Sequence, residues 1–146
     1  MNIMVSVDFS DATPRILEAT VKLARALTAK VWLLHVAEPE PDFVGYQAGP
    51  DVVRDQVARE FRGEHRKIQE YAESMREQGL AATALLIRGP IVETVIAEAR
   101  RLEADLLVVG SHGYGAVYDL LVGSVSRGIL KHTEIPVLVV PVRGLE

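Results

Sequence analysis

The fold of this chain is decided by the stretch Val108-Val109-Gly110-Ser111-His112-Gly113 and its continuation Gly123-Ser124-Val125-Ser126. The first part ends an apolar run over residues 105–109, which is typical of a buried strand. Its glycines open a loop, and the second part closes that loop at the start of a helix predicted over residues 124–132. Glycine lets a backbone approach a ligand closely, and a helix start offers unpaired N–H groups and a positive dipole end. The stretch therefore predicts a phosphate cradle built mostly from backbone.

Two other phosphate-binding motifs are absent from the sequence. A Walker loop requires a lysine after its second glycine, but Ile129 follows Gly128. A dinucleotide fingerprint should follow the first strand, where Phe9-Ser10-Asp11 stands instead. On the glycines alone, an alternative is that they only end a strand and cap a helix.

Composition and charge limit the classes of function. The chain has 146 residues, a formal net charge of −4 and no cysteine. This length suits one domain, and the negative charge argues against general nucleic-acid binding, which requires a basic face. The apolar run at the N-terminus, residues 3–7, is too short for a signal peptide or a membrane span. We therefore expect a cytoplasmic protein that binds neither nucleic acid nor membranes.

Short apolar runs alternate with helical patterns along the chain. The runs predict strands over residues 3–7, 30–36, 81–87, 106–109 and 137–142. Four helices are predicted. The first follows a cap at Ser10 or Asp11 and has Pro14 in its first turn. The others cover residues 51–78, begin at Gly89-Pro90, and cover residues 124–132. Residues 38–50 predict a long loop, either a lid or a mobile connector, and residues 116–122 a short helical turn.

This alternation predicts one α/β domain over residues 1–146. Strands that alternate with helices form a parallel sheet, and right-handed crossovers lead to a doubly wound fold with helices on both faces. Gly128 lies inside the last predicted helix, where it costs about 1 kcal/mol relative to alanine. A close approach of that helix to the sheet would explain its presence.

The spacing Gly-x2-Gly-x9-Gly-Ser, from Gly110 to Ser124, resembles the ATP-binding signature of the universal stress protein family. The resemblance extends over almost the whole chain. It includes Val5-Ser6-Val7-Asp8-Phe9-Ser10, Leu33-Leu34-His35-Val36 and Ile135-Pro136-Val137-Leu138-Val139-Val140. It implies a five-stranded parallel sheet with the strand order 3-2-1-4-5.

In that order the first and fourth strands are neighbours at a topological switch point, which is where such folds bind ligands. Asp8 ends the first strand and Gly110 ends the fourth, so we expect them side by side. The resemblance implies that Asp8 contacts the ribose and that the main chain of Val36 contacts adenine. Val7 takes a position often held by threonine, so only a backbone contact could survive there. The alternative role for Asp8 is to cap a helix or a turn.

The remaining implied contacts come from the glycine-rich stretch. Val109 and Gly110 would flank the nucleoside, and Gly113, Gly123, Ser124, Val125 and Ser126 match the phosphate side. His112 could donate to a phosphate, or it could be only a loop histidine. We expect His35 to be a packed core histidine. Arg127 and Lys131 could screen the phosphates or face solvent.

The last strand predicts contact with a second chain. Residues 137–140 are four apolar residues in a row at a sheet edge, which is a hazard if the edge is exposed. Pro136 and Pro141 suit an edge better than a central strand. Members of the family that the chain resembles commonly dimerise in this way, so we expect a homodimer through Val137 to Val142.

These expectations lead to an ATP-binding, dimeric stress-response or signalling module, with Mg²⁺ as an optional companion of ATP. No catalytic residue is assigned, and any hydrolysis would be slow, because Asp8 belongs at the ribose and not at the transferred phosphate. The alternatives are a slow nucleotide hydrolase and a dimeric module of the same fold without a nucleotide. A phosphorylated receiver domain is disfavoured, because Ile87-Arg88-Gly89 lacks the aspartate that a receiver needs after its third strand.

Overall fold

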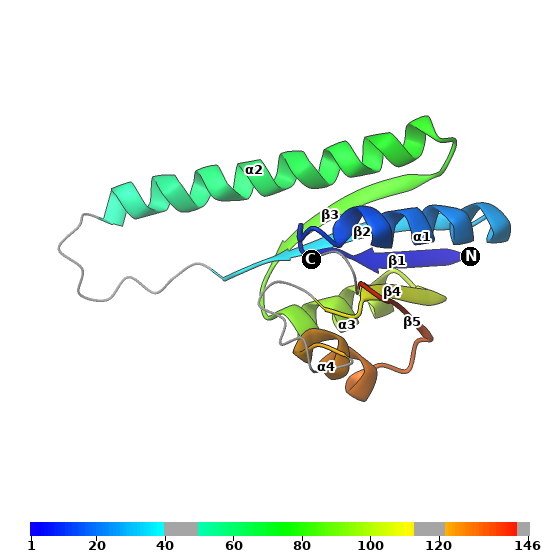
Figure 1. Cartoon of the computed structure of the whole chain (residues 1–146). Coiled ribbons are helices and arrows are strands. Elements are labelled where there is room, and N and C mark those ends of the chain that lie inside the picture. The colour runs from blue at the N-terminus through cyan, green and yellow to red at the C-terminus, as the bar shows by residue number, and fades with distance from the viewer. Residues whose placement is uncertain (40–49, 113–121, 143–146) are drawn as a thin grey trace.

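The computed structural model describes residues 1–39, 50–112 and 122–142, and all structural statements concern these residues. They form nine helices and strands that alternate along the chain (Figure 1). In order these are β1 (Asn2–Ser6), α1 (Thr13–Leu27), β2 (Lys30–Ala37), α2 (Pro50–Glu77), β3 (Ala82–Arg88), α3 (Ile91–Arg101), β4 (Leu106–Gly110), α4 (Ser124–His132) and β5 (Val137–Val140).

The five strands form one sheet in the order β3-β2-β1-β4-β5, with every neighbouring pair parallel. In the centre, Val5 on β1 is in register with Leu33 on β2 and Val108 on β4. The predicted fold and strand order are therefore confirmed, and β5 is an edge strand as expected.

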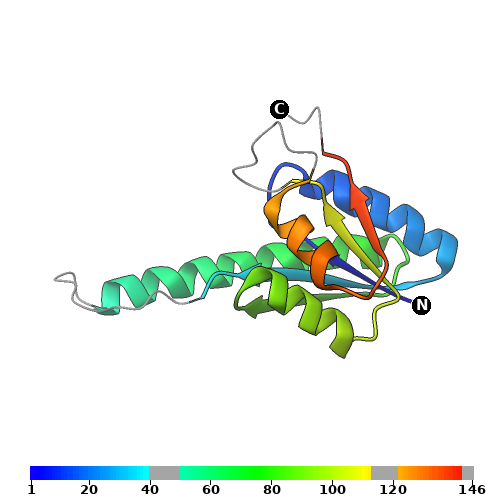
Figure 2. The same cartoon turned by 90° about the horizontal axis from the view of Figure 1, so that it is seen from below.

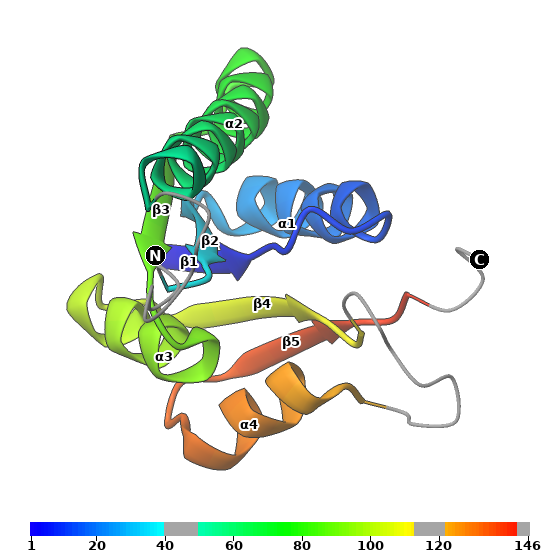
Figure 3. The same ribbon diagram turned by 90° about the vertical axis from the view of Figure 1, so that its left-hand side faces the viewer.

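Alternating residues of the central strands face two separate cores. Ile3 and Val5 belong to a core with residues of α1 and α2, whereas Met4 belongs to a core with residues of α3 and α4. Figure 3 shows the resulting three layers, with α1 and α2 on one side of the sheet and α3 and α4 on the other. Because β1 is buried on both faces, its sequence is a continuous apolar run and does not alternate.

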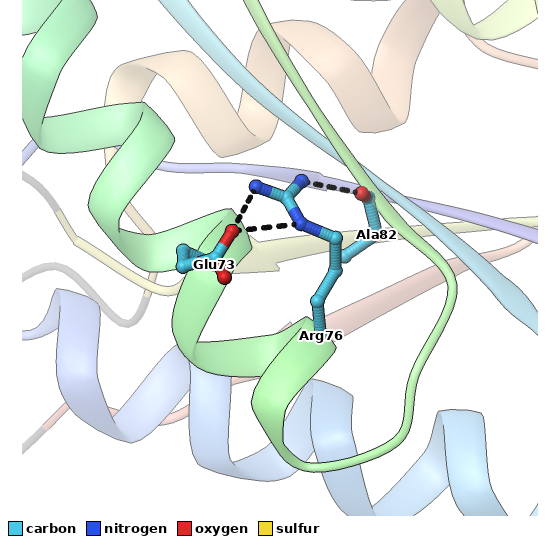
Figure 4. Close-up of polar contacts among 3 residues, drawn as sticks. All are labelled: Glu73, Arg76 and Ala82. Atoms are coloured by element: carbon cyan, nitrogen blue, oxygen red, sulfur yellow. Dashed lines mark hydrogen bonds and ion pairs between the residues drawn. The ribbon is translucent and has the colours of Figure 1, made fainter.

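The longest helix, α2, reaches beyond the sheet. Its N-terminal part extends past the edge of the domain in two perpendicular views (Figures 1 and 2), and its fully buried side chains, such as Ile68 and Met75, lie in the C-terminal half. The C-terminal end is tied to β3 by Arg76, which donates to Glu73 Oε2 over 2.7 Å and to the Ala82 carbonyl over 2.9 Å (Figure 4).

Two details differ from the sequence predictions. Neither Ser10 nor Asp11 caps α1, because the helix begins at Thr13 with Ala12 in the capping position and no side-chain cap. Gly128 approaches α3 and not the sheet: a Cβ at this position would lie 2.9 Å from Val92 Cγ2. The helix–helix contact therefore explains this glycine.

Two predictions fall mostly outside the described residues. Most of the predicted loop at 38–50 and of the helical turn at 116–122 lies there. Strand β5 ends at Val140, two residues before the predicted end.

Candidate functional site

A cavity of about 810 Å³ lies where the carboxyl ends of β1, β2 and β4 meet. Two helices complete it, α4 through its first turn and α2 through its central part, from Val57 to Lys67. The lining residues that were predicted from the sequence are Val7, Asp8, Val36, Val109, Gly110, His112, Gly123, Ser124, Val125 and Ser126. Of the predicted site residues, Gly113 alone lies outside the described part of the chain.

Asp8 follows β1, which ends at Ser6, and Gly110 ends β4; the two strands are neighbours, as the topology required. Asp8 lines the cavity, and its Oδ1 accepts a hydrogen bond from the Ser10 amide over 2.9 Å. Its Oδ2 has no hydrogen-bond partner among the described residues. The carboxylate therefore caps the turn with one oxygen and leaves the other without a described partner, so the two roles considered for Asp8 do not exclude each other.

The first turn of α4 presents backbone amides to the cavity. The N–H groups of Ser124, Val125 and Ser126 belong to the first turn of the helix, where no intrahelical acceptor exists, and all three residues line the cavity. The Gly123 amide is already used, because it donates to the Ser111 carbonyl over 2.6 Å. Free amides at the positive end of a helix dipole form an anion site.

Ser126 has a different role from Ser124. The Ser126 hydroxyl is buried and donates to the Gly110 carbonyl over 2.6 Å, which fixes the first turn of α4 to the end of β4. The Ser124 side chain is exposed. The hydroxyl of Ser126 thus holds the cradle together, while its amide stays available.

Two glycines are required for this close arrangement. A Cβ on Gly110 would lie 2.7 Å from Ile16 Cδ1, and a Cβ on Gly123 would lie 3.3 Å from the Ser111 carbonyl oxygen. The Cβ on Gly110 would also lie 3.3 Å from the His112 carbonyl oxygen. Both glycines therefore face a backbone carbonyl, and neither position accepts a side chain unless that backbone shifts.

His112 carries an unsatisfied polar atom at the edge of the cradle. Its Nδ1 is buried and has no hydrogen-bond partner among the described residues, and it lies 3.8 Å from the position of a Cβ on Gly123. Buried polar groups are normally paired. An unpaired ring nitrogen beside free helix amides therefore fits a ligand that has anionic oxygens.

The three predicted valines at the strand ends, Val7, Val36 and Val109, are buried and can offer only backbone to a ligand. Both backbone polar groups of Val7 are engaged, because its amide donates to the Leu34 carbonyl over 3.0 Å and its carbonyl accepts from His35 Nδ1 over 2.8 Å. The carbonyl oxygen retains a second lone pair, so one backbone contact from Val7 remains available.

One side of the cavity, formed by α2 and the β1–α1 turn, was not predicted from the sequence. His35 is not simply packed in the core: it lines the cavity, and its Nε2 pairs with Glu64 Oε2 at 3.0 Å. Phe9 stacks on His35 with ring centroids 4.1 Å apart, and Lys67 Nζ lies 5.4 Å from the centre of the Phe9 ring. Glu64, Lys67 and Tyr71 are spaced three and four residues apart in the sequence. This spacing indicates that they share one face of the helix, and it is the one sequence signal for this side of the cavity.

Phe9 also has an unusual backbone conformation. Its φ is +60°, which is a genuine outlier for a bulky residue. Such a conformation costs on the order of 1–3 kcal/mol and persists only where surrounding contacts hold it.

Charges of both signs line the cavity. Arg127 lies at the α4 end, and Lys67 and Arg88 lie on the opposite side, where Arg88 is 4.1 Å from the centre of the Phe61 ring. The carboxylates are Asp8, Glu38, Glu60 and Glu64. Within the described ranges, no cluster of three potential metal-binding side chains occurs, and no helix is long and apolar enough to cross a membrane.

These features define a doubly wound α/β protein with a cavity at its switch point. The model of the universal stress protein family matches residues 1–141, and the chain belongs to this family. It is 30% identical over 142 residues to universal stress protein YxiE of Bacillus subtilis, with 94% of this chain and 96% of the relative covered. A universal stress protein of Thermus aquaticus is also 30% identical, over 144 residues and with the same coverage.

Solved structures of the family share the fold. A universal stress protein in complex with cAMP superposes with a TM-score of 0.71 and 21% identity, with 97% of this chain and 96% of that chain covered. The universal stress protein from Archaeoglobus fulgidus in complex with dAMP has a TM-score of 0.65 and 20% identity, with 95% and 96% covered. Both relatives were therefore solved with adenine nucleotides.

Proposed function

We propose that this protein binds ATP in the switch-point cavity and acts as a dimeric stress-response or signalling module. The phosphates would lie at the first turn of α4 and the ribose at Asp8. The observation that carries the proposal is a shared cavity lining: three amides in the first turn of α4 and one carboxylate oxygen of Asp8, none with a hydrogen-bond partner among the described residues. The complexes of two structural relatives with cAMP and dAMP support an adenine nucleotide as the ligand.

Different residues would contact the three parts of the nucleotide. The amides of Ser124 and Val125, together with His112 Nδ1, would hold phosphate oxygens. Asp8 Oδ2 would accept from a ribose hydroxyl, and the main chain of Val36 would contact adenine. Mg²⁺ would enter with the phosphates of ATP, which supply oxygen ligands themselves.

Titration calorimetry with ATP tests this proposal. We expect the wild type to bind, and Asp8→Ala to weaken binding by about tenfold or more, because a hydrogen bond to a charged acceptor contributes about 1.5–3 kcal/mol. Glu18→Ala, on the exposed face of α1, is the matched control and should bind as the wild type does. Undetectable binding to the wild type at millimolar ATP would reject the proposal.

Slow hydrolysis is a separate question that the same protein can answer. No described carboxylate besides Asp8 lines the cavity on the strand ends next to α4, and Asp8 is assigned to the ribose. We therefore expect no steady phosphate release above background. ATP turnover that disappears when the first turn of α4 is disrupted would instead show that the protein is an ATPase.

The dimer belongs to the same proposal. Strand β5 is an edge strand of four apolar residues flanked by Pro136 and Pro141, and pairing with its copy would cover this edge. We expect twice the monomer mass in light scattering at micromolar concentration, and a monomeric mass would contradict this part. A cytoplasmic location is also part of the proposal, and cell fractionation would test it.

A further inference from the structure

The turn between β1 and α1 contains a strained residue next to the proposed ribose ligand. Phe9 has a φ of +60°, a region that glycine enters freely and bulky residues avoid. Asp8 precedes it and Ser10 follows it. The hydrogen bond from the Ser10 amide to Asp8 Oδ1 spans Phe9, so the backbone conformation of Phe9 determines whether that hydrogen bond can form.

The Phe9 ring is held by contacts from two elements. His35 on β2 stacks against it at 4.1 Å, and Tyr71 on α2 lies nearly parallel to it at 6.2 Å. Lys67 Nζ, also on α2, lies 5.4 Å from the ring centre. These contacts stabilise a conformation that the residue would otherwise avoid.

His35 is itself fixed on both sides. Its Nδ1 donates to the Val7 carbonyl over 2.8 Å, because a carbonyl oxygen can only accept, and its Nε2 pairs with Glu64 at 3.0 Å. The ring under Phe9 therefore links the end of β1 to α2. Together Val7, Phe9, His35 and Glu64 form a continuous support behind Asp8.

We propose that Phe9 is a positioning residue whose left-handed backbone conformation aims Asp8 Oδ2 at the ribose hydroxyls of the bound nucleotide. This inference rests on the proposed function, because it assigns Asp8 to the ribose. It goes further in stating that recognition of the hydroxyls depends on a residue that does not itself need to touch them. The ring contacts stabilise the turn, and the turn orients the carboxylate.

The test compares ATP with 2′,3′-dideoxy-ATP, using the ratio of their dissociation constants. This ratio isolates the hydroxyl contact, because a general loss of stability or of phosphate binding affects both ligands alike. We expect the wild type to prefer ATP by about tenfold or more, as the loss of a hydrogen bond to a charged group predicts. Asp8→Asn, which keeps a capping oxygen but loses the charge, gives the reference for a weakened contact.

Two variants of Phe9 differ by one methyl group and separate the backbone from the ring. Phe9→Gly loses the ring but adopts a φ of +60° without strain, so it should keep most of the wild-type ratio. Phe9→Ala loses the ring and keeps the strain, so its turn should relax. The ratio of dissociation constants should then fall to a value between about one and three. Thermal unfolding without ligand shows whether each variant is folded, and Lys22→Ala on the exposed face of α1 is the control.

Glu64→Ala provides a second variant that leaves Phe9 in place. It removes the partner of His35 Nε2 and should give a ratio between those of the wild type and Phe9→Ala, even if the Phe9→Ala variant does not fold. The inference is overturned if Phe9→Ala and Glu64→Ala both keep the wild-type ratio. It is also overturned if Phe9→Gly and Phe9→Ala lose the ratio equally, which would assign the effect to the ring alone.

Failure of the proposed function would look different. A wild type that binds neither ligand would reject nucleotide binding and this inference together. A wild type that binds both equally would reject the role of Asp8. A wild type that discriminates, with variants that discriminate equally well, would reject only the positioning role of Phe9.

Discussion

The two ends of the cavity are built on different principles. At the α4 end the chain uses backbone: free amides in the first helical turn, two closely packed glycines, and a serine hydroxyl that donates to the Gly110 carbonyl. At the α2 end it uses side chains, with Phe9, His35 and Glu64 in one connected group. The backbone end leaves a recognisable spacing in the sequence, whereas the side-chain end depends on which elements become neighbours.

The contrast extends to the glycines of the two helices. Gly128 in α4 is pressed against Val92 of α3, whereas no described atom lies within 4 Å of the position that a Cβ on Gly63 in α2 would take. The α4 end is therefore closely packed around small residues. At Gly63, by contrast, α2 has room for a side chain among the described residues.

Replacement of Gly123 should have the largest effect. Gly123→Val places a branched side chain where even a Cβ would lie 3.3 Å from the Ser111 carbonyl oxygen, so the first turn of α4 must shift. We expect ATP affinity to fall by about 100-fold or more, which is roughly 3 kcal/mol. Calorimetry measures this, and near wild-type affinity would show that the backbone end is not the phosphate site.

Loss of the Ser126 hydroxyl should have the next largest effect. Ser126→Ala leaves the partly buried Gly110 carbonyl without this donor, which costs about 1 kcal/mol or more. We expect reduced stability in urea denaturation and weaker ATP binding. Ser124→Ala is the matched control, because that side chain is exposed, and equal stability loss in both variants would contradict the assigned difference.

Gly128→Ala should destabilise the protein by about 1 kcal/mol. The new methyl would lie 2.9 Å from Val92 Cγ2, and this crowding should outweigh the gain in helix propensity, which is also about 1 kcal/mol. The second substitution Val92→Ala removes the obstructing methyl groups. The double variant should therefore lose less stability than the sum of the losses in the two single variants. Simple additivity of the two losses would show that the residues do not collide.

Gly63→Ala should have the smallest effect and the opposite sign. With free space around it, alanine gains about 0.5–1 kcal/mol of helix stability. Thermal unfolding should show a small increase in the midpoint and calorimetry an unchanged ATP affinity. Destabilisation would show that the outer side of α2 is packed against something.

Much of the backbone end could be predicted from the sequence, and much of the side-chain end could not. The spacing from Gly110 to Ser124 predicted where a strand ends and a helix begins, because glycine requirements are local. The side-chain end was missed because Phe9 and Tyr71 are more than sixty residues apart, and only the packing of α2 over the sheet brings them together. Capping by Ser10 or Asp11 was wrong because the helix begins later, at Thr13, which puts Ala12 in the capping position.

The sequence by itself determined the fold class, the family and the approximate place of the cavity, because hydrophobic periodicity and glycine spacing are properties of neighbouring residues. Tertiary structure decided the rest. It set the direction in which Gly128 packs, the use of the Ser126 hydroxyl and the link from Glu64 through His35 to Val7. Each of these depends on a contact between elements distant in the chain, and such contacts arise only when the sheet and its two helical layers assemble.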